Sequence, residues 1–418
     1  MVNARWASLS PVARVTTVLI GVLVVFGVVL RVQRLGAPAN FTFDEELFVR
    51  PAHGYLLGRP DGNDHPPLGK LFMAVGMILF GANTVGWRFA SLVFGLFTLV
   101  LVQWLGTELF RSRRAGWLAC AFFAADGFFI GYSRTGLLDG MLAALVLWAF
   151  LAAVVAEGTL DVLGSALLVG LAMSVKWSGA FAVFPAAAAV LLLGRVKRFS
   201  VLLFALAPAV HVLVWMGGLA LTGEKNDLRS LFGLMVRLFK HHQEMGTHDN
   251  ALASPWYSWI VLHHPIVVKL ASHGIGSTYA STVSNLATWA AGIVCLVGTP
   301  VMALVDVVRE RLKKPRLLER SFVTAMLLAW VGWLALLSPW MVGRGKYTFH
   351  YHYLPCAAFV LLLVAGGAAV LERKHERLVL AFVAAVLAVA IYFAPVWGEA
   401  TLTEHAAHLR LWFKLWQP

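Results

Sequence analysis

Long apolar stretches recur from one end of this chain to the other, and they constrain its fold more than any other feature. A helix needs about 20 apolar residues to cross the bilayer core, and runs of this kind begin at Val15 and end near residue 396. Of the 418 residues, 60% are hydrophobic and 13% are charged, against about 45–50% and about 25% in soluble domains. The sequence therefore predicts one membrane-embedded unit over residues 1–418.

The net charge of +13 follows from membrane topology rather than from a nucleic-acid partner. Basic clusters at 111–114, 195–198, 309–320 and 372–377 separate apolar runs, and short loops rich in Lys and Arg face the cytoplasm. With the N-terminus inside, alternation predicts an all-α integral membrane fold of about eleven spans with the C-terminus outside. The predicted spans are 15–30, 87–110, 115–131, 137–156, 161–176, 178–194, 199–221, 287–307, 321–341, 350–371 and 378–396.

Two segments depart from simple alternation. Residues 66–80 are apolar but begin with Pro-Pro and carry Lys70, and counting them as a span would break the charge parity. They are therefore predicted to form an interfacial helix. The two short spans 161–176 and 178–194 meet at residues 176–179, where a re-entrant pair is the alternative.

The composition of the predicted outer loops, 32–86, 222–286 and 342–349, is typical of a functional surface. They hold most of the histidines, mixed with Asp, Arg and Trp. In the first loop Asp44 and Glu45 stand among phenylalanines, where burial would raise a carboxylate pKa and favour a general base. The alternative is that both residues merely begin a helix as its cap and first turn.

Cations gather at the outer ends of the predicted spans. Several at one membrane depth suit a phosphate held at the lipid interface, although each alone also fits a snorkelling anchor. These cations are Arg88, Arg134, Lys176, Arg344 and Lys346. Trp256, in the 222–286 loop, suits either stacking on a sugar or docking that loop to the bilayer.

Six short motifs follow one another between residues 40 and 360. They are Phe43-Asp44-Glu45, Asp64-His65-Pro66-Pro67-Leu68-Gly69-Lys70, Ser133-Arg134 with Leu137-Leu138-Asp139, Val175-Lys176-Trp177-Ser178-Gly179, Ser254-Pro255-Trp256-Tyr257-Ser258-Trp259 and Tyr351-His352-Tyr353-Leu354-Pro355. In this order the set resembles the protein O-mannosyltransferases, membrane enzymes of glycosyltransferase class C. The resemblance implies an eleven-span fold with interfacial helices in the first outer loop.

The same resemblance implies a reaction and its residues. Mannose would pass from polyprenyl-phosphate mannose to Ser or Thr hydroxyls of exported polypeptides, with inversion, on the extracytoplasmic face of a prokaryotic plasma membrane. Asp44 would be the base, Glu45 its supporting neighbour, and Arg88 would lie near the donor phosphate. The expected substrate-binding residues are Asp64, His65, Asp139, Trp256 and His352.

The resemblance also bears on cofactors and partners. It implies no cofactor and metal-independent transfer, although Asp44, Glu45, Asp64, His65 and Asp139 offer oxygen and nitrogen ligands for a metal. The expected partners are the lipid-linked donor, the polypeptide acceptor, membrane lipids and, since family members often pair, a second copy in a dimer.

Three alternatives remain open at this stage. Residues 222–286 are too few for the soluble β-trefoil module of eukaryotic members, which leaves a glycolipid or a cell-wall glycan as an alternative acceptor. A transporter of lipid-linked sugar is disfavoured because the sequence shows no inverted repeat. A non-catalytic subunit that presents the donor is disfavoured because the acidic pair is present.

Overall fold

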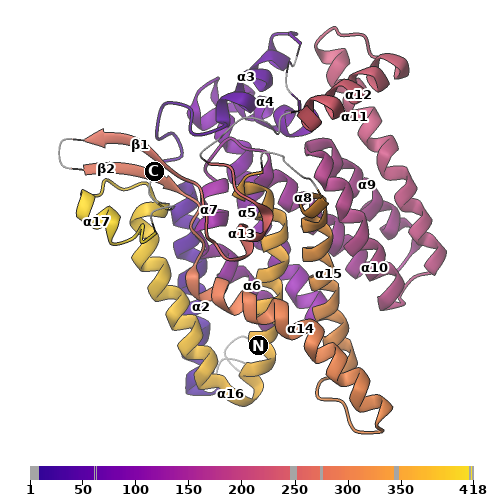
Figure 1. Ribbon diagram of the computed structural model, residues 1–418, viewed down its shortest axis with the longest axis vertical. Coiled ribbons are helices and arrows are strands. Elements are labelled where there is room, and N and C mark those ends of the chain that lie inside the picture. Colours follow the sequence, from indigo (N-terminus) through magenta and orange to yellow (C-terminus); the bar gives the residue numbers. More distant parts are fainter. Residues whose placement is uncertain are drawn as a thin grey trace.

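Helices dominate the structure, a computed structural model that describes residues 9–60, 62, 64–244, 252–273, 276–342, 348–413 and 416 (Figure 1). The elements are α2 (Pro11–Val32), α3 (Glu45–Leu56), α4 (Leu68–Phe80), α5 (Thr84–Phe110), α6 (Arg113–Ala124), α7 (Gly127–Tyr132), α8 (Asp139–Val155), α9 (Thr159–Val175), η1 (Trp177–Ala182), α10 (Val183–Leu193), η2 (Arg198–Leu206), α11 (Ala207–Leu221), α12 (Leu228–Glu244), α13 (Trp256–Ile260), β1 (Val267–His273), β2 (Gly276–Ser281), α14 (Leu286–Arg311), α15 (Arg320–Val342), η3 (His350–Tyr353), α16 (Leu354–Trp397) and α17 (Glu404–His408).

Six helical segments of the described chain are long and apolar enough to cross a membrane. They are Pro11–Val32, Thr84–Phe110, Arg198–Leu221, Leu286–Arg311, Arg320–Val342 and His350–Trp397. Four shorter apolar helices are Leu68–Phe80, Asp139–Val155, Thr159–Val175 and Trp177–Leu193. The prediction of an integral membrane protein is thus confirmed, while the count of eleven crossings and their orientation stay predictions.

The predicted span 115–131 is wrong as one continuous helix. The chain breaks between α6 and α7, where Asp126 caps α7 by accepting a hydrogen bond from the Phe128 backbone N–H at 3.0 Å. Its other oxygen accepts one from the Asn285 backbone N–H at 2.9 Å, at the start of α14. A short acidic side chain competes well for backbone donors, and this is why a helix ends and restarts at such a residue.

The all-α prediction is also wrong in one place, since the 222–286 loop contains a two-stranded antiparallel sheet. β1 pairs with β2 so that Val267 faces Ser281 and Val268 faces Ala280. The β-branched and aromatic residues of the two strands favour extended backbone. The backbone of Ser277 in β2 also bridges to Leu402, which joins this hairpin to the C-terminal segment.

The core lies where α6, α8 and the first half of α16 pass through the middle of the bundle. α8 is apolar on every face, and between Met141 and Val154 only Trp148 is well exposed. A helix that is hydrophobic all round is expected in the interior. α16 bends at His375, whose backbone is not helical (φ −136°, ψ 54°), between the predicted spans 350–371 and 378–396.

Both large predicted outer loops lie at one end of the bundle. α3 and α4 from the first loop and α12 from the second lie at the top of Figure 1, whereas the bend in α16 and the connection between α14 and α15 lie at the bottom. The site described below is at the upper end.

Gly27 sets the distance between α2 and α6. A Cβ atom at Gly27 would stand 2.0 Å from the Ala124 carbonyl oxygen, whereas one at Gly21 of the same helix would meet nothing within 4 Å. We expect Gly27→Ala to lower the free energy of unfolding by about 1–3 kcal/mol, because overpacking forces the helices apart. Gly21→Ala is the matched control and should leave the thermal unfolding midpoint of the purified protein unchanged or raise it slightly, because Ala is the better helix former. Equal midpoints for both variants would contradict the prediction.

Candidate functional site

The Asp44 carboxylate is not used to cap a helix. Asp44 occupies the position before α3, but its side chain makes no capping hydrogen bond. Instead its Oδ2 atom accepts a hydrogen bond from the Tyr351 hydroxyl at 3.3 Å. Phe43, just before it, has φ 51°, a left-handed conformation that is strained in a bulky residue and tends to occur at functional sites. The interpretation that Asp44 merely begins a helix therefore fits its backbone but not its carboxylate.

The environment of Asp44 favours a base that binds a proton more readily than a free carboxylate does. Burial raises the pKa of Asp44 above its ordinary value, and nearby Asp139 adds to that increase. The charge of Lys176 and the hydrogen bond from Tyr351 lower the pKa in turn, but burial is the largest influence. Asp44 is still only half-buried, so a substrate can reach it.

Lys176 and Asp139 form a buried ion pair next to Asp44. α9 ends at Val175 and the extended backbone of Lys176 (φ −147°, ψ 144°) turns its side chain toward the start of α8, where Lys176 Nζ lies 2.7 Å from Asp139 Oδ2. The same Nζ lies 4.8 Å from the centre of the Tyr351 ring. The second oxygen of Asp139, Oδ1, is buried and has no hydrogen-bond partner in the described chain.

His65, a neutral imidazole, is the fourth member of a group that also contains Asp44, Lys176 and Asp139. Its ring stacks between Phe48 of α3 and His242 of α12, with ring centres 5.5 Å apart on both sides. Burial, followed by the charge of Lys176, holds the pKa of His65 well below its usual range. The backbone carbonyl of His65 accepts a hydrogen bond from Lys70 Nζ at 2.7 Å. A neutral imidazole can donate through one nitrogen and accept through the other.

Asp64 lies at the edge of the same group. His241 Nε2 lies 3.0 Å from its carboxylate, and His242 Nε2 lies 3.1 Å from its backbone oxygen. These contacts connect the first predicted outer loop to α12 of the second, so both loops build one surface.

Glu45 and Arg88 form a fully buried ion pair that faces the protein. Arg88 Nε and Nη2 donate to the two carboxylate oxygens of Glu45 at 2.7 and 2.8 Å. Glu45 also accepts from the backbone N–H groups of Thr42 and Gly136. The remaining Arg88 donors go to four backbone carbonyls and one hydroxyl of the first loop, those of Leu35, Ala37, Pro38, Asn40 and Thr42. These contacts disfavour the prediction that Arg88 binds the donor phosphate directly.

Arg134 is placed in a similar way. Its guanidinium group is buried, donates to the carbonyls of Leu30 and Gln33, and lies 3.2 Å from the Glu399 carboxylate. Arg134 therefore ties α2 to the C-terminal segment, and a direct contact with a phosphate is disfavoured here as well.

Of the other predicted site residues, His352 lies beside the Asp44 group, with its ring centre 4.4 Å from that of Tyr351. Trp256 lies in separate surroundings, and two residues lie outside the described residues. His352 stacks on Trp340 with ring centres 3.9 Å apart, and its Nδ1 accepts a hydrogen bond from the Phe349 backbone. Trp256 packs edge to face on Tyr257, at the start of α13. Arg344 and Lys346 lie outside the described residues.

Sequence reasoning missed three residues of the group, namely Tyr351, Lys70 and His242. Tyr351 and Lys70 stand inside the motifs quoted above, where only their neighbours were chosen. His242 stood in no motif, and the amphipathic character of α12 was the one signal that it faces the site.

The geometry can combine proton abstraction with stabilisation of an anion. Asp44 accepts a hydrogen bond from the Tyr351 hydroxyl and Lys176 lies over the ring of the same tyrosine, so a base and a cation both contact one side chain. No group of three or more His, Cys, Asp or Glu side chains among the described residues is placed to hold a metal ion. The expectation of a metal-independent reaction stays a prediction.

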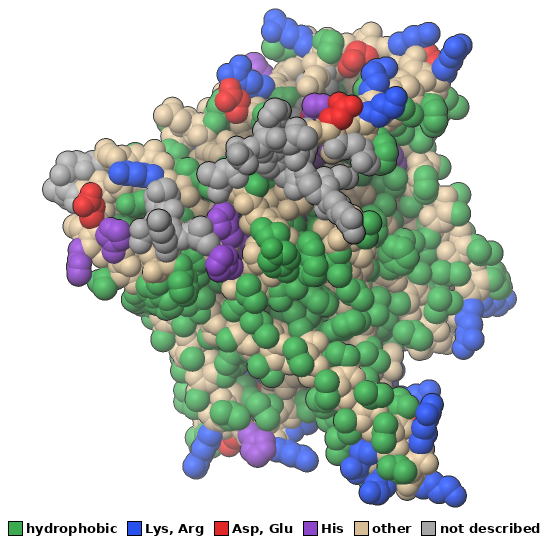
Figure 2. All heavy atoms as spheres, viewed as in Figure 1, with side chains coloured by type: hydrophobic (Ala, Val, Ile, Leu, Met, Phe, Trp, Pro, Cys, Tyr) green, Lys and Arg blue, Asp and Glu red, His purple; other side chains and the backbone are tan. Residues whose placement is uncertain are grey.

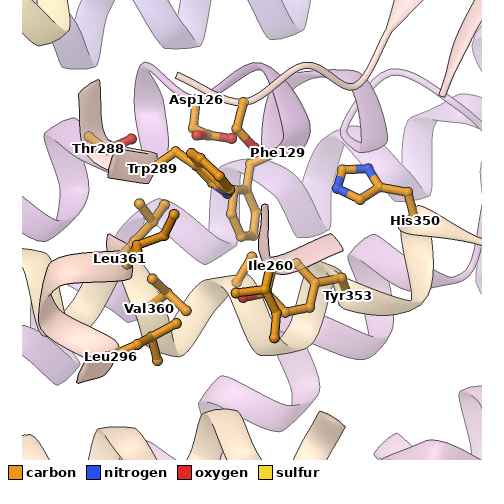
Figure 3. Close-up of a pocket in the computed structure, with 13 residues that line it drawn as sticks. Asp126, Phe129, Ile260, Thr288, Trp289, Leu296, His350, Tyr353, Val360 and Leu361 are labelled. Carbon is orange, nitrogen blue, oxygen red and sulfur yellow. The ribbon is translucent and has the colours of Figure 1, made fainter. Parts of the chain in front are cut away.

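A small cavity behind η3 is distinct from this group. Its volume is about 20 Å³, which is room for about one water molecule. Asp126 and His350 border it among apolar side chains such as Phe129 and Trp289 (Figure 3). This size excludes a sugar or a lipid.

Protein-family models match most of the chain. A model described as dolichyl-phosphate-mannose-protein mannosyltransferase matches residues 21–84, and a second of the same description matches residues 64–216. A model of the C-terminal four-span region of protein O-mannosyltransferases matches residues 228–416. A relative from Mycolicibacterium smegmatis, named polyprenol-phosphate-mannose–protein mannosyltransferase, is 24% identical over 95% of this chain and 92% of its own.

Solved structures share the fold. The Saccharomyces cerevisiae protein O-mannosyltransferase Pmt1-Pmt2 complex bound to the sugar donor contains a chain that matches with a TM-score of 0.80. The match has 14% identity and covers 99% of this chain and 94% of that one. ArnT from Cupriavidus metallidurans bound to undecaprenyl phosphate matches with a TM-score of 0.58 and 14% identity, over 94% of this chain and 79% of that one. The fold is therefore that of the class C membrane glycosyltransferases.

The Glu45–Arg88 pair should stabilise the fold strongly. We expect Arg88→Ala to lower the free energy of unfolding by about 3–5 kcal/mol, because it leaves a buried carboxylate unpaired. The exposed pair of Arg50 and Glu46 on α3 supplies the control, since Arg50→Ala should cost at most about 1 kcal/mol. Thermal unfolding of both purified variants measures the difference. A stable Arg88→Ala protein that binds the donor more weakly would instead support the prediction that Arg88 binds the donor phosphate.

Proposed function

The chain belongs to the protein O-mannosyltransferase family, and from this membership we propose that it transfers mannose from polyprenyl-phosphate mannose to polypeptides. The acceptors are Ser or Thr hydroxyls of exported proteins, and the anomeric centre is inverted. The observation that carries the proposal is the half-buried Asp44 carboxylate, which is hydrogen-bonded to the Tyr351 hydroxyl while the Lys176 ammonium group lies over the ring of the same tyrosine.

On the acceptor side, Asp44 is the base. It removes the proton of the acceptor hydroxyl while that oxygen bonds to the anomeric carbon of mannose. The bond from this carbon to the phosphate oxygen breaks, and the electron pair leaves with the phosphate. A single displacement of this kind inverts the carbon and needs only one carboxylate at the reacting centre. Burial supports the role, since a pKa raised above its ordinary value makes Asp44 a better proton acceptor.

On the leaving side, Lys176 stabilises the charge that develops on the phosphate. Asp139 holds the Lys176 ammonium group in place at 2.7 Å, so no reorganisation is needed during the reaction. Arg344 and Lys346, in the third predicted outer loop, are further candidates for the phosphate. Arg88 and Arg134 act as positioning residues, because their buried contacts are with the protein.

The remaining predicted residues would hold the sugar and order the loops. His65 is neutral and can bond a mannose hydroxyl. Asp64 links the two outer loops through His241 and His242. His352 and Trp256 supply aromatic and polar surface on η3 and α13, suited to a sugar or to the acceptor chain.

The proposal places the site on the extracytoplasmic face of a bacterial plasma membrane. The basic clusters of the short loops support this orientation, and the mycobacterial relative supports the bacterial origin. The loops 32–86 and 222–286 then lie outside together, on a single membrane unit that spans residues 1–418.

Transfer of labelled mannose from polyprenyl-phosphate mannose by the purified protein tests the proposal. A Thr-rich peptide should become labelled, and a chelator should leave the rate unchanged. Label in a glycolipid acceptor but not in the peptide would identify a class C transferase of a different acceptor. No transfer to either acceptor would overturn the proposal.

The Asp44 carboxylate should be essential in this assay. We expect Asp44→Asn to reduce kcat at least 100-fold, the lower end of what general-base catalysis contributes (about 10²–10⁴), while donor affinity and thermal stability are retained. Glu46→Gln is the control, because Glu46 is two residues away and pairs with exposed Arg50. Near wild-type turnover in Asp44→Asn would refute the assignment of the base.

The pH dependence should report the Tyr351 hydrogen bond. Asp44 acts when deprotonated, so kcat/KM rises with pH through the pKa of Asp44. The Tyr351 hydroxyl lowers that pKa, so its removal in Tyr351→Phe should raise the pKa and move the acidic limb to higher pH. Tyr257→Phe, at an exposed tyrosine on α13, should leave the limb in place. A limb that moves to lower pH, or not at all, in Tyr351→Phe contradicts the prediction.

A further inference from the structure

A large cavity opens at the end of the bundle opposite to Asp44. Its volume is about 780 Å³, and it lies between the ends of α5, α8 and α10 and the segments around the start of α15 and the bend in α16. Figure 2 shows the hollow at the lower right, with Lys and Arg side chains on both of its sides. We call it the basal cavity.

The charge that lines the basal cavity is mostly positive. Five cationic residues face two acidic ones, which gives a net charge of +3. The cations are Arg111, Arg195, Arg320, Arg373 and Lys374, and the acids are Glu108 and Glu319. No ion pair of the described chain includes any of these five cations, whereas Arg114 and Arg316, at the same end, are paired with Glu372 and Glu310.

The inner wall of the basal cavity is apolar. Leu109, Phe110, Val154, Leu193 and Phe322 line it. Exposed leucines stand beside them at the mouth, where 59% of Leu192 and 54% of Leu317 is accessible. Unpaired cations above an apolar wall at helix ends match a ligand with an anionic head and hydrocarbon chains.

We propose that the basal cavity binds an anionic glycerophospholipid from the membrane leaflet at this end, with the phosphate among the five cations and the acyl chains along the apolar wall. Basic pockets between membrane helices recognise anionic lipid headgroups in this way. The volume lies within the range of small-molecule sites, about 300–1,000 Å³. The proposal does not depend on the mannosyl-transfer activity.

Native mass spectrometry of the purified protein with phosphatidylglycerol tests the proposal, with phosphatidylcholine of the same acyl chains as the neutral comparison. The test variant is Arg320→Gln/Arg373→Gln/Lys374→Gln. The matched control is Arg311→Gln/Lys313→Gln/Lys314→Gln, which removes three exposed cations at the same end that do not line the cavity. Each Lys or Arg near an anionic lipid contributes about fivefold in affinity.

We therefore expect the wild-type protein and the control to retain phosphatidylglycerol, and the test variant to bind it at least tenfold more weakly. Phosphatidylcholine binding should be equal in all three proteins. The thermal unfolding midpoint should rise with phosphatidylglycerol in the first two proteins only. Should the triple variant fail to fold, Arg373→Gln alone should give a smaller loss in the same direction.

Two results would overturn the proposal. One is equal retention of phosphatidylglycerol by the test variant and the control. The other is displacement of the lipid by millimolar glycerol phosphate or inorganic phosphate, which would show a site for a free phosphate ion without a contribution from the apolar wall.

Discussion

The buried ion pair of Glu45 and Arg88 is the interaction on which the rest of the site depends. Arg88 belongs to the long helix α5, and Glu45 is the first residue of α3 in the first predicted outer loop. Their two hydrogen bonds, with those from Arg88 to the loop carbonyls, hold that loop against the bundle. Because Asp44 precedes Glu45, fixing one carboxylate inward leaves the other facing Tyr351. Two adjacent acids thus have different tasks, one structural and one chemical.

Burial explains why the site needs so many compensating charges. A carboxylate or ammonium group taken out of water is costly unless it is paired. Lys176 is paired with Asp139, Arg134 with Glu399 and Arg88 with Glu45, so only Asp44 is left with a weak hydrogen bond from a tyrosine. Burial raises the pKa of Asp44, and the charge of Lys176 and the Tyr351 hydrogen bond offset this only in part. The protein thereby keeps one reactive carboxylate in a region where the neighbouring buried charges form ion pairs.

Much of the fold could be predicted from the sequence because apolar runs and basic clusters are local signals. Each predicted span overlaps a helix, and the segment at 66–80 is a separate short helix, α4. The break at Asp126 was missed although its capping contact with the Phe128 backbone is local, and only its second contact, with the backbone N–H of Asn285, depends on a segment 159 residues away. The hairpin of β1 and β2 was missed because strand pairing within a loop leaves no long periodic pattern. In the site, Asp44, His65, Lys176 and Asp139 were predicted, whereas the partner of Asp44, Tyr351, was not.

The sequence by itself determined the membrane class, the positions of the helices and the family, because hydropathy, charge and ordered motifs are properties of neighbouring residues. Only the tertiary structure decided which cations form ion pairs within the protein. Arg88, Arg134 and Lys176 looked alike as single cations at the ends of apolar runs. Their partners come from segments distant in the chain, Glu45, Glu399 and Asp139, and a pairing over such distances is fixed by packing rather than by local sequence.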